Sequence, residues 1–202
     1  MLASGSGTNL QAIIDRLHRP SHRGPAIEVA GVASDKPAAG ALRRAGEAGI
    51  ESAVFPGEEF TDREARDAAM ADWIDARGAD LVVLAGYMQL LSATFVARFP
   101  NRIVNVHPAL LPSFPGLDAI GQALEHGVGV TGVTVHFVDE GVDSGPIILQ
   151  RAVPVPANRN RATLEEAIHR TEHEIYPQAI AMIAEGRVRI DARNARLVVI
   201  DD

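Results

Sequence analysis

Cysteine is absent from the 202 residues of the sequence. The absence excludes disulfides, thiolate metal sites and thiol nucleophiles, and it fits a reducing compartment. Runs of lysine or arginine are also absent, and 26 acidic residues outweigh 19 basic ones to give a formal net charge of -7. This balance argues against a nucleic-acid partner, although a local pocket for a small anion is still allowed.

Long hydrophobic runs are missing as well. The segment MLASGSGTN lacks the charged flank and apolar stretch of a signal peptide, and no later segment offers the run of about 18 apolar residues that a spanning helix needs. We therefore expect a cytoplasmic protein without a membrane partner. At 47% hydrophobic residues the chain can bury a sizeable core, so residues 1–202 are expected to form a single domain.

Short apolar runs alternate with helical patterns along the chain. Such alternation indicates βαβ units, and hence an α/β fold of Rossmann-like type: a mostly parallel twisted sheet with helices on both faces. The final stretch RVRIDARNARLVVI predicts a short C-terminal strand pair. The expected strands are 27–33, 81–85, 103–106, 133–138 and 147–149. One helix is expected to begin near residue 10, and three others are expected over 38–49, 62–77 and 163–185. A capping box from Thr163 to Glu166 opens the last of them.

The glycine-rich segment SGSGTN, residues 4–9, stands between an apolar stub and the first helical pattern. Glycines let the backbone approach an anion, and Thr8 or Asn9 could cap the helix and donate to a phosphate oxygen. The segment matches neither the dinucleotide fingerprint nor the P-loop, so a site for one phosphate and a plain tight turn are both open.

Polar side chains follow two of the expected strands. Asn105 and His107 are two residues apart, so they share one face of a strand that Pro108 ends. The loop 139–145 follows the next expected strand and carries Asp143. A carboxylate near His107 would favour the imidazolium and raise its pKa, while the Asn105 amide would offer N–H donors to an oxyanion. These functions suit acyl transfer.

Other interpretations of these residues remain. His107 could be a strand-end histidine bonded to backbone, Asp143 could be a turn residue, and His136 is interpreted as a packed residue behind the site. His107, His136 and Asp143 could also form a two-histidine, one-carboxylate metal site. Glu172 lies on the apolar stripe of the last helix, where an inward carboxylate needs either a buried arginine or a ligand group as partner.

Five segments together resemble one family: SGSGTNLQAIID, LAGYMQLLS, NVHPALLPSFPG, TVHFVDEGVDSGPIILQ and TEHEIYP. In this order they are similar to the phosphoribosylglycinamide formyltransferases, which belong to the 10-formyltetrahydrofolate-dependent formyltransferases and act in purine biosynthesis. The resemblance runs nearly end to end. It implies that Asn105, His107 and Asp143 are catalytic and that the substrate amine attacks the formyl carbon directly.

The resemblance also implies the ligands and their residues. The formyl donor would be 10-formyltetrahydrofolate as a cosubstrate, no metal would be needed, and the protein would be a monomer or a homodimer that binds small molecules. It further suggests a cis bond at Leu111–Pro112. The implied ribonucleotide contacts are Gly7, Thr8, Asn9, His169, Arg170, Thr171 and Glu172. The implied folate contacts are Arg63, Met88, Gln89, Leu90, Leu91, Asn105, Asp139, Glu140, Gly141, Val142 and Asp143.

Three rival functions are retained. Methionyl-tRNA formyltransferase and formyltetrahydrofolate deformylase share the chemistry, but neither shows the SGxGTN pattern found at residues 4–9. From a different class, a non-catalytic sugar-phosphate-binding module would make Asn105, His107 and Asp143 incidental. Requirement for the ribonucleotide distinguishes transfer from hydrolysis, and turnover of either kind excludes the binding module.

Overall fold

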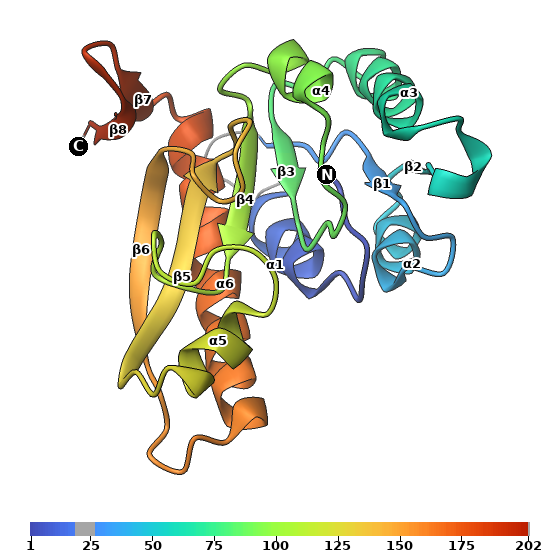
Figure 1. Ribbon diagram of the computed structural model, residues 1–202. Helices are drawn as coiled ribbons and strands as arrows, with labels where there is room; N and C mark the ends of the chain where they lie inside the picture. The colour runs from blue at the N-terminus through green and yellow to red at the C-terminus, as the bar shows by residue number, and fades with distance from the viewer. Residues whose placement is uncertain (19–26, 202) are drawn as a thin grey trace. The chain divides into compact units, whose positions relative to one another are not determined.

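The computed structural model describes residues 1–18 and 27–201, which form two compact units, Met1–Val104 and Asn105–Asp202. Each unit has its own helices and strands (Figure 1). The single catalytic domain expected over residues 1–202 stays a prediction. No helix in the described ranges is both long and apolar enough to cross a membrane.

Short parallel strands organise the first unit. β1 pairs in parallel with β2, and Leu2 bridges in parallel to both Ala33 of β1 and Leu84 of β3. β1 and β3 are fully buried, as is usual when helices cover a sheet, whereas β2 is mostly exposed. The elements are α1 (Thr8–Leu17), β1 (Val32–Ser34), α2 (Gly40–Glu47), β2 (Ser52–Val54), the 3-10 turn η1 (Gly57–Glu59), α3 (Arg63–Asp75), β3 (Val82–Leu84) and α4 (Ala93–Arg98).

β4 (Ile103–His107) leads from the first unit into the second, where the strand order is β4-β5-β6. β5 and β6 are antiparallel, with a register shift between Val135 and His136. The long helix α6 packs on β5 and β6 (Figure 1). The remaining elements of this unit are α5 (Ala119–Glu125), β5 (Val130–Phe137), β6 (Ile147–Pro154), α6 (Arg161–Ala184), β7 (Val188–Asp191) and β8 (Asn194–Ile200).

Most sequence predictions of secondary structure are confirmed. Alternating helices and strands, the antiparallel pair β7–β8 and the cis bond at Leu111–Pro112 are all present. The capping predictions were wrong. α6 is capped by Asn160, whose Oδ1 accepts from the Thr163 N–H, and α1 is capped by Gly7 without any side-chain hydrogen bond. Asn160 lies three residues before Thr163, at the distance from which an N-cap side chain accepts from the third helical N–H, so α6 begins about one turn earlier than the sequence predicted.

Candidate active site

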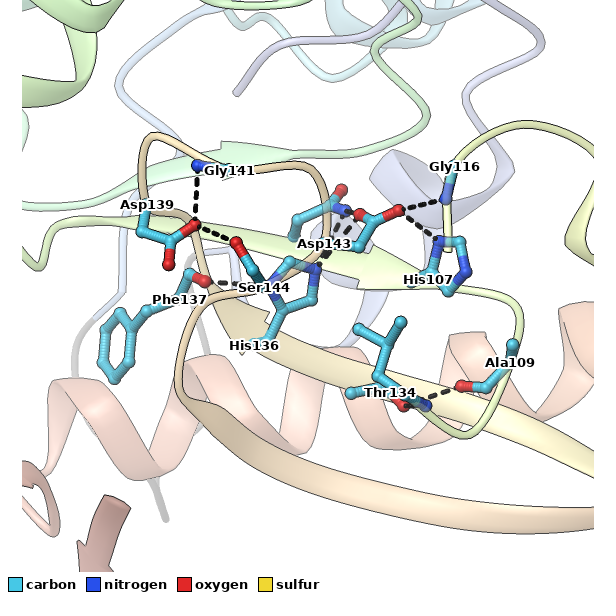
Figure 2. A network of polar contacts seen from close by, with 12 residues as sticks. His107, Ala109, Gly116, Thr134, His136, Phe137, Asp139, Gly141, Asp143 and Ser144 are labelled. Carbon is cyan, nitrogen blue, oxygen red and sulfur yellow. Dashed lines mark hydrogen bonds and ion pairs between the residues drawn. The ribbon is translucent and has the colours of Figure 1, made fainter. Parts of the chain in front are cut away.

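Asn105, His107 and Asp143 come together in the second unit. Asn105 and His107 are alternate residues of β4, and Asp143 lies in the loop that follows β5. Figure 2 shows the Asp143 carboxylate reaching between His107 and His136. The Asp143 Oδ2 atom is 3.3 Å from His107 Nδ1, and its Oδ1 is 3.5 Å from Asn105 Nδ2. The structure thus brings the three residues predicted from sequence into one cluster.

Both ring nitrogens of the buried His107 face oxygen atoms. Nε2 donates to the backbone carbonyl of Phe114 at 2.8 Å, and Nδ1 faces Asp143. A carbonyl only accepts, so the proton on Nε2 is fixed. The 3.3 Å contact on Nδ1 is longer than the roughly 2.7–2.9 Å of a strong charge-assisted hydrogen bond. An N–H at Nδ1 is therefore only loosely held and can also donate to a ligand oxygen.

Asp143 is held in an unusual backbone conformation. Its φ is 51°, in the left-handed region, and its Oδ2 accepts from the Gly116 N–H at 2.7 Å. Partial burial alone would raise the pKa of Asp143, but the neighbouring His136, the Gly116 N–H and the charge of His107 outweigh it and lower the pKa below its ordinary value. A carboxylate at neutral pH is the result.

Asn105 has acceptors on both sides of its amide nitrogen. Nδ2 is 3.2 Å from His136 Nε2 and 3.5 Å from Asp143 Oδ1. The second distance is at the limit of a hydrogen bond. Asn105 is also partly exposed, unlike its neighbours on β4. One of its N–H bonds is consequently available to an oxygen of a ligand.

The loop after β4 supplies the backbone groups that hold this cluster. Phe114 lies in the left-handed region at φ 54°, a rare conformation for a bulky residue, and presents its carbonyl to His107. Gly116, at φ 78°, presents its N–H to Asp143. Sequence analysis missed both residues because the groups they contribute are backbone atoms, which no side-chain pattern marks.

Thr134 of β5 anchors the start of the same loop. Its hydroxyl donates to the Ala109 carbonyl at 2.6 Å and accepts from the Leu111 N–H at 3.1 Å (Figure 2). It also accepts from Gln150 Nε2 at 2.9 Å, and the same Nε2 donates to the Leu111 carbonyl at 2.8 Å. The hydroxyl is fully committed, so the loop is fixed from β5 and β6.

The loop after β5 is closed by its own side chains. Asp139 Oδ1 accepts from the Gly141 N–H at 3.0 Å and from Ser144 Oγ at 2.7 Å (Figure 2). Gly145 follows, where a Cβ would stand 1.9 Å from the Phe137 carbonyl oxygen. Asp139, Glu140, Gly141 and Val142, predicted to contact folate, are exposed in this loop, and Asp143 is its inward member.

In the first unit, the glycine-rich loop packs against α2. A Cβ on Gly7 would stand 2.7 Å from Ala41 Cα, which explains the glycine on packing grounds alone. Arg44 donates from Nε to the Ser6 carbonyl at 2.9 Å and so brings positive charge beside the loop. Thr8 and Asn9 begin α1, so the loop ends at the N-terminus of this helix, where the helix dipole favours an anion.

The segment Met88–Leu91 of the first unit, predicted to contact folate, is held by buried polar groups. The Met88 N–H donates to Ser4 Oγ at 2.9 Å, and Gln89 Nε2 donates to Asp35 Oδ2 at 3.0 Å. Just after the segment, the Ser92 N–H donates to Asp67 Oδ2 at 2.6 Å, and Asp67 is paired with the buried Arg66 at 2.8 Å. Met88, Gln89 and Leu90 remain exposed, as does Arg63 at the start of α3.

The predicted ribonucleotide residues on α6 differ in burial. Glu172 is buried on the inner face as predicted, whereas His169 and Arg170 are exposed and Thr171 bonds back to the Ala167 carbonyl. Among residues 1–18 and 27–201, no group of three or more histidine, aspartate or glutamate side chains could hold a metal ion. The metal alternative at His107, His136 and Asp143 therefore has no support from this geometry.

Comparison with known protein families gives one match over most of the chain. The family model described as formyl transferase matches residues 1–180. The phosphoribosylglycinamide formyltransferase of Escherichia coli (strain K12) is 42% identical over 197 residues, which cover 98% of this chain and 92% of that protein. That of Bacillus subtilis (strain 168) is 39% identical over 183 residues, with 91% and 92% covered.

A larger protein and a solved structure complete the comparison. The trifunctional purine biosynthetic protein adenosine-3 of Drosophila melanogaster is 46% identical over 190 residues, but the chain spans only 14% of its length. The crystal structure of glycinamide ribonucleotide transformylase 1 from Symbiobacterium toebii superposes with a TM-score of 0.92 at 50% identity, covering 100% of this chain and 92% of that one.

Proposed function

Because the chain belongs to the phosphoribosylglycinamide formyltransferase family and has its fold, we propose that it transfers a formyl group from 10-formyltetrahydrofolate to the amine of phosphoribosylglycinamide. The products are the N-formylated ribonucleotide and tetrahydrofolate. The reaction is a step of purine biosynthesis, carried out by a cytoplasmic enzyme without a metal.

The observation that carries the proposal is the pair of loosely held donors around Asp143. An N–H on His107 Nδ1 and an N–H of Asn105 each face a different oxygen of that carboxylate, at 3.3 and 3.5 Å. Acyl transfer needs two such donors, placed before the reaction where they can donate to a developing oxyanion. Asp143 lies next to His107 Nδ1 and orients the imidazole ring.

The reaction proceeds without a covalent enzyme intermediate. The amine nitrogen attacks the formyl carbon, a C–N bond forms, and the carbonyl electrons move onto oxygen, where Asn105 and His107 donate to the oxyanion. Collapse of the tetrahedral adduct breaks the bond from carbon to the folate nitrogen. The attacking amine loses one proton and the leaving folate nitrogen gains one, and the Asp143–His107 pair carries protons between them.

The ligand contacts are part of the same proposal. The N-terminus of α1 at Thr8 and Asn9, with Gly7 before it and Arg44 close by, supports binding of the ribonucleotide phosphate in the first unit. In the second unit we assign His169, Arg170, Thr171 and Glu172 to the same substrate. For folate we assign Arg63, Met88, Gln89, Leu90, Leu91, Asn105, Asp139, Glu140, Gly141, Val142 and Asp143.

The test is a turnover assay of matched variants. Asn105→Ala, His107→Ala and Asp143→Ala should each lower kcat by about a hundredfold or more, because each removes an oxyanion donor or the group that holds one. Asp191→Ala and Asn194→Ala are the matched controls, because they replace the same two residue types, aspartate and asparagine, in the C-terminal hairpin. Both should leave kcat unchanged. Near-normal turnover of His107→Ala contradicts the mechanism. Tetrahydrofolate release that needs no ribonucleotide identifies a deformylase instead.

A further inference from the structure

His136 is fully enclosed next to the catalytic cluster, yet the mechanism gives it no part. It is the penultimate residue of β5 and only 2% of it is exposed. A polar ring at such a position needs partners for both nitrogens. Its Nδ1 is 2.8 Å from the Phe137 carbonyl oxygen, and its Nε2 is 3.2 Å from Asn105 Nδ2.

A register shift in the sheet lies beside this residue. β5 and β6 pair residue for residue up to Val135 and Leu149, after which His136 pairs with Ile147, so Ile148 is extra on β6. Bulges of this kind are frequent beside active sites. Thr134, two residues earlier, faces the loop after β4, and the shift follows it directly.

The Phe137 carbonyl decides which nitrogen of His136 carries the proton. A carbonyl oxygen only accepts, so the 2.8 Å contact requires an N–H at Nδ1. In the neutral ring Nε2 then has a lone pair and accepts from Asn105. An amide oxygen cannot donate, so the lone pair on His136 Nε2 requires the NH₂ group of Asn105, not its oxygen, to face His136. The second N–H of that NH₂ group then faces Asp143 Oδ1.

We propose that His136 is a positioning residue, which acts as a neutral hydrogen-bond acceptor to hold the Asn105 amide with an N–H directed at the reacting formyl oxygen. The proposal rests on the proposed function. Without this acceptor the Asn105 amide can rotate and present its oxygen to the developing oxyanion, which turns a stabilising contact into a repulsive one.

The alternative is a proton on Nε2 that points at Asp143, the arrangement in which His136 adds to the lowering of the pKa of that carboxyl by the Gly116 N–H and His107. That contact, 3.6 Å to Oδ1, is beyond hydrogen-bond length, whereas the contact with Asn105 is 3.2 Å. An N–H on Nε2 would also face the Asn105 NH₂ group, so two donors would meet unless the amide turned over. The shorter contacts at both ring nitrogens favour the neutral form with the proton on Nδ1.

A double-mutant cycle tests the role. His136→Phe keeps the ring but removes the acceptor, and should lower kcat about tenfold to a hundredfold with both KM values within about twofold. His136→Gln, which places an amide oxygen where Nε2 stands, should recover most of the loss. In the Asn105→Ala background, His136→Phe should change kcat by less than about twofold, because the group it positions is gone.

The outcomes separate this proposal from the proposed function. If Asn105→Ala leaves kcat unchanged, the oxyanion mechanism itself fails. If Asn105→Ala is impaired but His136→Phe is not, or if His136→Phe costs as much in the Asn105→Ala background as in the wild type, only the positioning role fails. If His136→Phe does not fold, the kcat of His136→Gln is compared with that of the wild-type protein. A His136→Gln variant with a kcat far below the wild-type value then counts against the proposal.

The tautomer can be measured on the unaltered protein. Nitrogen-15 NMR of histidine-labelled protein at neutral pH should show His136 with a protonated Nδ1 and an unprotonated Nε2. Assignment of that signal comes from its loss in His136→Gln. A protonated Nε2 overturns the proposal, since such a nitrogen cannot accept from Asn105.

Discussion

Thr134→Val should destabilise the protein, although it exchanges two side chains of nearly the same shape. Thr134 is completely buried and its hydroxyl bonds the Ala109 carbonyl, the Leu111 N–H and Gln150. Valine fits a β-strand well, so packing is preserved. The loss is confined to hydrogen bonds.

The magnitude follows from the groups left behind. Gln150 keeps its second bond, to the Leu111 carbonyl, so the Ala109 carbonyl and the Leu111 N–H are the two that lose a partner. A buried polar group without a partner costs about 1–3 kcal/mol, and small shifts recover part of that. We expect the free energy of unfolding to fall by about 2–4 kcal/mol, out of the roughly 5–15 kcal/mol typical of a domain.

Thr131→Val is the matched control on the same strand. Thr131 is also buried, but its hydroxyl has no hydrogen-bond partner among residues 1–18 and 27–201. Removing an unsatisfied hydroxyl should leave stability unchanged or raise it. Equilibrium urea unfolding of both variants measures the difference, with similar m values as the sign that the same structure unfolds. Equal losses in the two variants would refute the argument.

Three further predictions concern the loops around the cluster. Gly145→Ala should lower both stability and kcat, because its Cβ would stand 1.9 Å from the Phe137 carbonyl oxygen that holds His136. Gly116→Ala has open space for a Cβ but a φ of 78°, so it should lower the free energy of unfolding, measured by thermal unfolding, by only about 1–2 kcal/mol. Asp118→Ala should destabilise more than Asp118→Asn in urea, since asparagine keeps the cap on the Gly121 N–H and loses only the charge that pairs with Arg161. The lowered pKa of Asp143 stabilises the folded state above the ordinary carboxyl pKa of about 3.9. The free energy of unfolding of the wild-type protein should therefore exceed that of Asp143→Asn fully at pH 7, by less below about pH 4, and not at all below the folded-state pKa. A difference that grows with acidity would contradict the sign.

The side chains of the cluster could be predicted because strand geometry and chain order carry them. Two-residue spacing puts Asn105 and His107 on one face of β4, and a polar loop after the next strand is the natural source of a carboxylate. The inward position of Glu172 followed from helical periodicity in the same way. These inferences depend on local spacing and on the rule that strand ends gather at one edge.

The supporting groups could not be predicted because they belong to the backbone. The Phe114 carbonyl and the Gly116 N–H exist in every residue, and only the left-handed conformations at φ 54° and 78° aim them at His107 and Asp143. β2 escaped prediction because Ser52–Val54 is short and mostly exposed, which leaves no apolar pattern. The register shift beside His136 could not be predicted either, because only the pairing of β5 with β6 determines it.

The most direct test of the central claim follows the formyl carbon. The protein is incubated with 10-formyltetrahydrofolate labelled at the formyl carbon and with phosphoribosylglycinamide, and both products are quantified together. We expect the label on the amine of the ribonucleotide in equimolar amount with tetrahydrofolate, and no tetrahydrofolate when the ribonucleotide is left out. Label recovered as free formate, or no transfer at all by the folded protein, would contradict the proposed function.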